Sequence, residues 1–274
     1  MHQNVMKKIA MGSSSLSGLG RPGLATAALL GLALSCGMAH ADEKTPVNAN
    51  TKSFAVKLGA TRVIYDPDSN GATLAITNPQ DYPMLVQSTV KAEDNTSPAP
   101  FVVTPPLFRL DGKQQNRLRI VRTGGTMPTD RETLQWLCIK GIPPKTDDAW
   151  AKDTAGKSLA PKPKGMSLDV QLSISNCIKL LVRPGAVKGS LTDVGGNLTW
   201  HVAGGHLTVK NPTPFYMNFA SLKLGSTTVP NAEYVAPFGS KSYPLPKGAS
   251  TGQVQWKLIT DYGGESKVYQ AAVQ

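Results

Sequence analysis

The sequence predicts an all-β protein made of two β-sandwich domains in tandem. From residue 54 onward, apolar and polar residues alternate along short segments, which is the period of a strand that buries one face. Turn-forming residues interrupt this alternation about every eight to twelve residues, a spacing typical of sandwiches and barrels. The 26 glycines and 21 prolines follow no collagen-like repeat and mark these turns. No long segment has a helical period, so a mainly helical protein is excluded.

The first expected domain spans residues 42–185. Each of its strands ends at a turn rich in Pro, Gly, Asn or Asp, such as the segment 66–71. The expected strands are 54–58, 62–65, 74–76, 84–86, 101–103, 108–110, 118–121 and 134–138, the last closing at 141–144. The polar segment 145–165 predicts a long mobile loop.

A strand with one wholly apolar face follows this loop. The residues on that face are Met166, Leu168, Val170, Leu172 and Ile174. The chain then reaches Arg183-Pro184-Gly185, where we place the boundary to a second domain, 186–274. Its expected strands are 198–202, 206–209, 215–224, 243–245 and 254–259. Three tryptophans lie in alternating strands and are expected in the cores: Trp136, Trp200 and Trp256.

The first 41 residues have the pattern of a cleavable export signal. Lys7 and Lys8 precede the apolar run 24–34, and an A-x-A motif ends at Ala41, after which we expect cleavage. The true start is either Met1 or Met6. No later apolar run is long enough to span a bilayer, so we expect a protein exported to the periplasm of a Gram-negative cell without stable membrane insertion.

The net charge narrows the choice of partner. The chain has 29 basic and 18 acidic residues, a net charge of +11. Loss of the signal would leave 26 basic residues against the same 18 acidic ones, a net charge of +8. Composition alone allows a nucleic acid, an anionic membrane or an acidic protein as partner. Export argues against nucleic acid.

Two cysteines remain beyond the signal, Cys138 and Cys177. In an oxidising compartment an even pair predicts a disulfide. A metal site is the alternative, but the remaining histidines, His201 and His206, lie at no tight spacing from either cysteine. We therefore expect no metal.

The sequence offers no enzymatic motif. It has no P-loop, no dinucleotide-binding glycine pattern, no G-x-S-x-G and no H-E-x-x-H. We therefore expect no catalytic residue and no cofactor.

Several short motifs, taken in order, resemble the PapD-like family of periplasmic chaperones of the chaperone–usher pathway. They cover nearly all of the chain beyond the signal. The motifs are GATRVIY at 59–65, TNP at 77–79, VTPPLFRL at 103–110, NRLRI at 116–120, NCIKLLVRP at 176–184, NPTPFY at 211–216 and DYGG at 261–264. The long segment after residue 144 and the two cysteines are similar to the long-loop (FGL) subfamily. The resemblance implies two immunoglobulin-like domains.

The resemblance also implies a function. Such chaperones bind pilin-type or capsule-type subunits that lack a strand, complete the subunit fold with a donor strand, and deliver the subunit to an outer-membrane usher. The row Met166, Leu168, Val170, Leu172 and Ile174 is then the donor strand, with Phe54, Val56 and Leu58 alongside as a second edge. The alternative is an ordinary sandwich strand that faces its own core. An exposed apolar row would also favour a self-capped homo-oligomer.

Two cations are expected to anchor the subunit. In the family an Arg of the first strand and a Lys near the end of the donor strand hold the subunit's terminal carboxylate, and Arg62 and Lys179 occupy these places. The alternative is a pair of solvated surface cations. Asp261 is expected either to join the two domains, as the resemblance implies, or to lie in a turn.

Cys138 and Cys177 enclose 38 residues, which include the loop and the donor row. Closing a loop of this size contributes roughly 4 kcal/mol in the chain-entropy model. The bridge either clamps the base of the donor arm or only stabilises the sandwich, and the two roles are compatible.

Two other functions compete with the chaperone. The first is an exported immunoglobulin-like adhesin or structural surface subunit, which would carry one incomplete domain and its own N-terminal extension. The second is a secreted hydrolase with a β-sandwich module, for which no pair of acid and base carboxylates can be identified.

Overall fold

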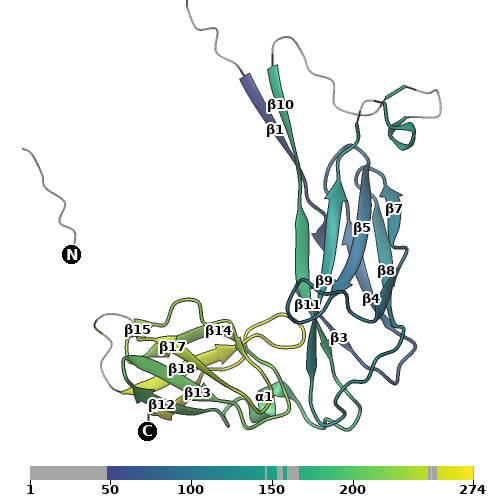
Figure 1. Cartoon of the computed structure of the whole chain (residues 1–274). Helices are drawn as coiled ribbons and strands as arrows, with labels where there is room; N and C mark the ends of the chain where they lie inside the picture. The colour runs from purple at the N-terminus through teal and green to yellow at the C-terminus, as the bar shows by residue number, and fades with distance from the viewer. Residues whose placement is uncertain are drawn as a thin grey trace, which may run out of the picture. The chain divides into compact units, whose positions relative to one another are not determined.

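The computed structural model describes residues 48–145, 147–152, 157–158, 167–245, 248 and 252–273. The expected signal, Met166 and much of the loop 145–165 lie outside these residues. The described chain is mainly strands, with one short helix, α1 (Leu191–Val194), and one 3-10 turn, η1 (Ala149–Ala151) (Figure 1). The all-β fold is confirmed.

The first sandwich packs two sheets face to face. One sheet has the order β2 (Lys57–Leu58), β4 (Ala72–Thr77), β8 (Gln115–Arg122) and β6 (Phe101–Thr104). The other has the order β3 (Arg62–Tyr65), β11 (Ser175–Val182), β9 (Thr133–Ile142), β5 (Met84–Lys91) and β7 (Leu107–Leu110). Within these two sheets the pairing of β3 with β11 is parallel, and the other pairings are antiparallel.

A separate two-stranded sheet adjoins this sandwich. β1 (Asn48–Phe54) pairs in parallel with β10 (Ser167–Ser173), and β10 leads through Ile174 into β11 (Figure 1). Two expected strands are therefore divided. The expected strand 54–58 is split between β1 and β2, which pair with different partners, and the apolar row 166–174 is interrupted at Ile174.

The second sandwich also has two sheets. One is β12 (Thr199–Ala203), β13 (His206–Lys210) and β17 (Ser240–Pro244). The other is β15 (Thr227–Thr228), β14 (Met217–Leu224), β18 (Gln253–Leu258) and β19 (Tyr269–Ala272), with β16 (Tyr234–Val235) also paired to β14. The sequence did not predict β15, β16 or β19, since two of them have only two residues and the third lacks a clear alternation.

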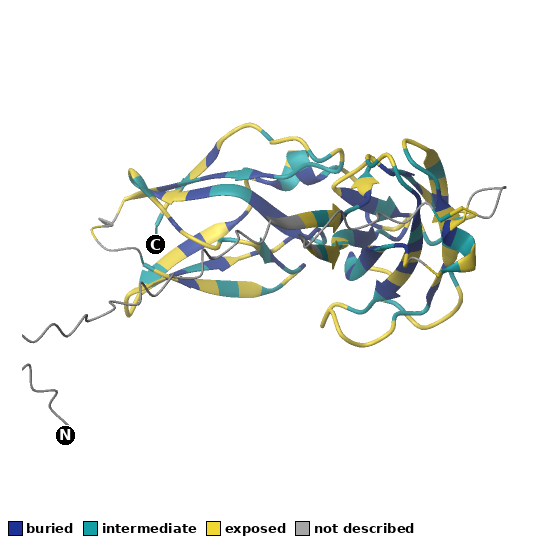
Figure 2. Cartoon of the chain, turned by 90° about the horizontal axis from the view of Figure 1, so that it is seen from above, coloured by how far each residue is buried: buried dark blue, intermediate teal, exposed yellow. Residues whose placement is uncertain are grey.

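Each sandwich has its own core, and buried residues alternate with exposed ones along the strands (Figure 2). Trp200 and Trp256 lie in the second core, with ring centroids 5.1 Å apart, as expected. Trp136 differs from the expectation, since its side chain is only partly buried and lines a pocket.

The Asn-Pro motifs of the two sandwiches have the same structural role. Asn78 and Asn211 are fully buried, and each side-chain amide donates to three backbone carbonyls. Buried backbone oxygens need such partners. The two motifs therefore fix equivalent turns in the two sandwiches.

An ion cluster links the two sandwiches. Arg183 follows β11 and donates through Nε to Glu132 (2.7 Å) and through both terminal nitrogens to Asp261 (2.7 and 2.8 Å). Glu132 also accepts from the backbone N–H of Tyr216 (2.7 Å). Burial raises the pKa of Glu132, an effect that Arg183 opposes. Both placements expected for Asp261 are found, since it contacts Arg183 across the two sandwiches and also lies in a turn.

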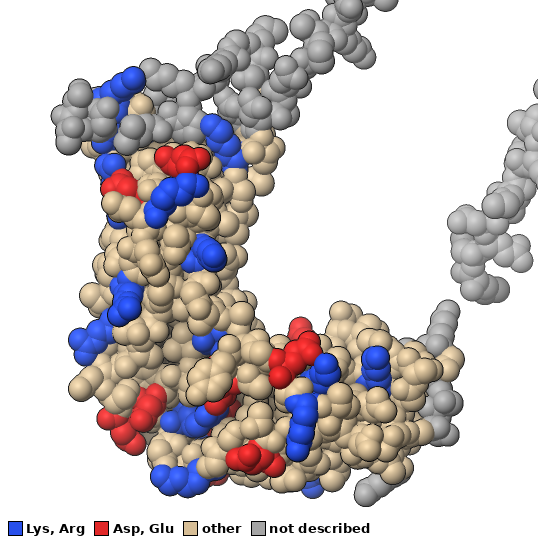
Figure 3. Space-filling view, turned by 180° about the vertical axis from the view of Figure 1, so that it is seen from behind, with Lys and Arg blue, Asp and Glu red and all other residues tan. Residues whose placement is uncertain are grey.

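Charge is dispersed over the face in Figure 3. Lys and Arg side chains there are scattered among Asp and Glu rather than gathered in one basic patch. The described basic side chains therefore form no continuous surface on this face.

Candidate functional site

The apolar row of β10 is largely open to solvent. Leu168 is 56% exposed and Leu172 is 44% exposed, while Val170 and Ile174 are partly buried. The fifth residue of the expected row, Met166, lies outside the described residues. The structure therefore does not bury this row in the core of its own sandwich, which was the alternative interpretation.

The exposure of β10 follows from the length of its neighbour. β9 ends at Ile142, before Pro143 and Pro144, and its pairing with β11 begins at Lys140 and Ser175. Among the described residues, β10 pairs with β1 alone. A strand with one unpaired edge and an apolar face is suited to pair with a further strand.

Gly141 allows three segments to meet at the base of β10. Its N–H donates to the carbonyl of Ile174 (3.0 Å), and its own carbonyl accepts from the Ser173 hydroxyl (2.6 Å). A Cβ at residue 141 would lie 2.3 Å from the carbonyl oxygen of Phe54, so only glycine fits. The sequence placed this glycine in a closing turn, whereas the structure places it inside β9.

The expected second edge is formed by backbone rather than by side chains. β1 pairs with β10 in register from Asn48 opposite Ser167 to Phe54 opposite Ser173. Phe54 and Val56 are buried in the first core, 0% and 2% exposed, and Leu58 packs against that core. These three side chains therefore support the sandwich, because the chain enters it at Phe54.

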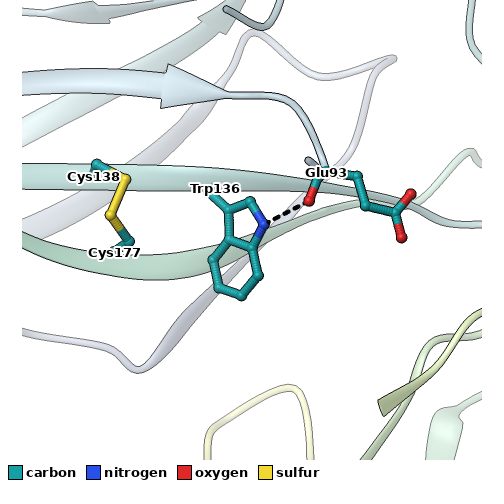
Figure 4. Close-up of a disulfide and its surroundings, with 4 residues drawn as sticks. All are labelled: Glu93, Trp136, Cys138 and Cys177. Carbon is teal, nitrogen blue, oxygen red and sulfur yellow. Dashed lines mark hydrogen bonds between the residues drawn. A yellow bond between two sulfur atoms is a disulfide. The ribbon is translucent and has the colours of Figure 1, made fainter. Parts of the chain in front are cut away.

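The expected disulfide is present. Cys138 on β9 and Cys177 on β11 are direct cross-strand partners with a Cα–Cα distance of 4.0 Å (Figure 4). Figure 4 also shows Trp136, two residues before Cys138, whose indole N–H donates to the carbonyl of Glu93 (3.1 Å). The bridge joins the two strands just below the base of β10, where that strand ends at Ser173 and β11 begins at Ser175.

Arg62 and Lys179 lie side by side. They are register partners on β3 and β11, so their side chains extend from the same face of the sheet. Arg62 is 7% exposed, and its Nη1 donates to the carbonyl of Ile259 (3.1 Å) in the second sandwich. Its Nε is buried without a partner among the described residues. The alternative of a solvated surface cation therefore does not fit Arg62.

Lys179 is held by neutral groups. Its ammonium donates to Oδ1 of Asn218 and lies 4.5 Å from the ring centroid of Tyr234 and 5.9 Å from that of Trp136. Burial, followed by the positive charge of Arg62, lowers the pKa of Lys179 to about 8. Among the described residues, neither Lys179 nor Arg62 forms a salt bridge.

The two cations line an open pocket of about 570 Å³. Its walls include Trp136, Ile178, Ala220 and Ile259. A second hollow, of about 490 Å³, shares Thr61, Cys177 and Ile178 with the first and extends along β11 to Ser175. The hollows therefore lead from the cation pair toward the base of β10, and this combined surface is the candidate site.

The sequence did not reveal the part that the second sandwich contributes to this site. Asn218 is 1% exposed on β14, and Tyr234 lies on the two-residue strand β16. An asparagine among the apolar residues of an expected strand was the available signal for Asn218. No sequence pattern identified Tyr234.

Other kinds of site are not seen in the described part of the chain. No group of three or more His, Cys, Asp or Glu residues that could hold a metal ion occurs there. None of the described helices is long and apolar enough to cross a membrane.

Two family models match most of the chain. The model of the PapD N-terminal domain, described as a pili and flagellar-assembly chaperone, matches residues 55–188. The model of the C-terminal domain of the pili-assembly chaperone PapD matches residues 193–270.

Individual proteins are similar over nearly their full length. The chain is 53% identical to the chaperone protein AfaB of Escherichia coli, over 89% of this chain and 96% of AfaB. The crystal structure of the E. coli chaperone DraB is 56% identical with a TM-score of 0.71, over 83% of this chain and 100% of DraB. A chain of the Salmonella enterica SafA pilin–SafB chaperone complex is 53% identical with a TM-score of 0.73, over 83% of this chain and 100% of that chain.

The titration of Lys179 tests the described electrostatics. We expect its ammonium to titrate near pH 8. We expect Arg62→Ala to raise this pKa, because the variant removes an adjacent positive charge and admits water. NMR of isotope-labelled lysine side chains measures the pKa, with Lys179→Arg to assign the resonance. An unchanged pKa in Arg62→Ala would show that the two cations do not interact.

Proposed function

Because the chain belongs to the PapD family of pili-assembly chaperones, we propose that it captures pilin-type or capsule-type subunits by donor-strand complementation and delivers them to an outer-membrane usher. The observation that carries this proposal is the exposed apolar row of β10, which leads to two adjacent cations without acidic partners. The family is one of chaperones, and we propose that this member acts without catalysis and without a cofactor.

The donor strand contributes apolar contacts and backbone hydrogen bonds. A subunit that lacks one strand exposes a groove and a sheet edge, which β10 can fill from its unpaired side. Each buried aliphatic side chain contributes about 1.5–3 kcal/mol, so the row supplies on the order of 10 kcal/mol before the loss of rigid-body freedom. The SafB chaperone was solved together with a pilin, which supports a partner of this class.

The cation pair sets the register of that strand. A terminal carboxylate can accept from both Arg62 and Lys179, and such charge-assisted hydrogen bonds are stronger than neutral ones. A shift by one residue would turn the apolar row of β10 away from the groove. We therefore propose that the carboxylate fixes which pocket each apolar side chain enters.

We propose the periplasm as the place of action. The expected signal in residues 1–41 supports export, and the Cys138–Cys177 disulfide fits an oxidising compartment. Release then requires that the donor strand of an incoming subunit replaces β10 at the usher. Similarity over two chaperone domains favours this function over an adhesin or a structural subunit.

The anchor is tested by removing each cation. We expect Arg62→Ala and Lys179→Ala each to weaken capture by about 10- to 150-fold, since a hydrogen bond to a charged group contributes about 1.5–3 kcal/mol. Purified variants would be titrated with a refolding pilin-type subunit encoded beside the chaperone gene. Lys210→Ala, an exposed cation of the second sandwich, serves as control. Undiminished capture by both variants would overturn the anchor.

The donor row is tested on its two exposed leucines. We expect Leu168→Ser and Leu172→Ser each to weaken capture at least tenfold, with little change in thermal stability because both side chains are already exposed. Gln171→Ser alters the opposite face of the same strand and is expected to capture normally. Equal effects of Leu172→Ser and Gln171→Ser would argue against a row that faces the groove.

The disulfide is tested by reduction. The reduced protein should lose roughly 4 kcal/mol of unfolding free energy, measured by urea titration. We also expect weaker capture in reduced protein that is still folded, because β9 and β11 are no longer clamped below β10. Cys138→Ser/Cys177→Ser serves as a permanently reduced form. Normal capture by a folded, reduced chain would refute the clamp and leave only the stabilising role.

A further inference from the structure

We infer that Asn218 is a positioning residue that holds the Lys179 ammonium with a neutral acceptor, so that the ammonium is oriented but its charge stays available to a subunit carboxylate. This inference rests on the proposed function. It assigns part of the anchor to the second sandwich, since Asn218 lies on β14.

The orientation of the Asn218 side chain is fixed by its surroundings. Asn218 is 1% exposed, and its Nδ2 donates to the carbonyl of Tyr216 (3.1 Å). The amide oxygen then faces the ammonium of Lys179 and accepts its hydrogen bond. The oxygen of an amide held in this way is directed at Lys179, from which it accepts.

The same residue is also connected to the second cation. The backbone carbonyl of Asn218 accepts from the N–H of Ile259 (2.8 Å), and the carbonyl of Ile259 accepts from Nη1 of Arg62 (3.1 Å). Lys179 and Arg62 are register partners in the first sandwich. A closed ring of contacts therefore sets the separation of the two cations, and half of that ring belongs to the second sandwich.

The acids near this site are engaged elsewhere. Glu132 and Asp261 pair with Arg183. Two further carboxylates are also paired: Glu233 with Lys241 at 3.4 Å, and Glu265, which lines the pocket, with Lys257 at 2.8 Å. In the described residues the two anchor cations therefore contact backbone, amide and aromatic groups, none of which cancels their charge. A carboxylate at residue 218 would instead pair with the Lys179 ammonium and cancel its charge.

Three charged groups on neighbouring parts of the chain act on Lys179. Burial, followed by Arg62 on β3 and Lys241 on β17, lowers the pKa of Lys179 to about 8, while Glu233 just before β16 raises it. The rings of Trp136 on β9 and Tyr234 on β16 are neutral. A bound carboxylate raises the pKa of the ammonium, so capture above pH 8 takes up a proton and weakens as the pH rises.

The decisive variant is Asn218→Asp, which replaces the amide by a carboxylate of nearly the same shape. We expect at least a tenfold loss of capture at pH 7 and a raised pKa of Lys179. The unfolding midpoint is measured to show that the variant folds, because it also loses the hydrogen bond to the carbonyl of Tyr216. Because the pKa of Lys179 is raised in this variant, its capture should begin to weaken at a higher pH than that of the wild type. Asn197→Asp adds the same charge at an exposed position of the second sandwich and is expected to capture normally.

A second variant keeps the test valid if Asn218→Asp does not fold. Asn218→Ala removes the acceptor, and we expect a several-fold loss of capture together with a lower pKa of Lys179. Capture within twofold of the wild type in a folded Asn218→Asp protein, or in Asn218→Ala, would overturn the inference. Arg62→Ala and Lys179→Ala are measured alongside. If they also capture normally, the proposed anchor itself fails; if they lose capture, only the role of Asn218 fails.

Discussion

The hydrogen-bonded register of β11 is the constraint on which the candidate site depends. This strand is paired on one side with β9 and on the other with β3, and its residues meet their partners at fixed positions. Cys177 faces Cys138, Lys179 faces Arg62, and the chain leaves the strand at Arg183, which reaches the second sandwich. Because side chains alternate between faces, a shift of one residue would misplace the disulfide, the cation pair and the domain contact together.

The candidate site differs from the rest of the domain contact in how its cations are paired. Arg183, which joins the sandwiches, is satisfied by two carboxylates, whereas Arg62 and Lys179 have only neutral partners among the described residues. A buried cation without an acidic partner is unfavourable, and an anion relieves it. The chain therefore uses paired charges for structure and leaves unpaired ones where a partner is expected to bind.

Local sequence patterns predicted much of the fold but only part of the site. Alternation and turns predicted the strands because these signals lie within a few residues, and the two cysteines predicted their own bridge. The sequence did not show that Gly141 meets the carbonyl of Phe54, or that Asn218 meets Lys179. Such contacts join segments far apart in the chain and depend on which sheet each strand enters. Arg62 and Lys179 were found through family motifs, and their shared position on adjacent strands became visible only in the structure.

The pairing of β1 with β10 bears on the speed of the proposed capture. Seven residues of β10 are held in register by β1 within the free chain. Fixing the backbone of a residue costs about 1–2 kcal/mol, so much of the ordering of this strand is completed during folding. A strand that is already extended can pair on encounter, whereas a disordered arm must order first. For a partner that aggregates while its groove is empty, a fast association matters as much as a tight complex.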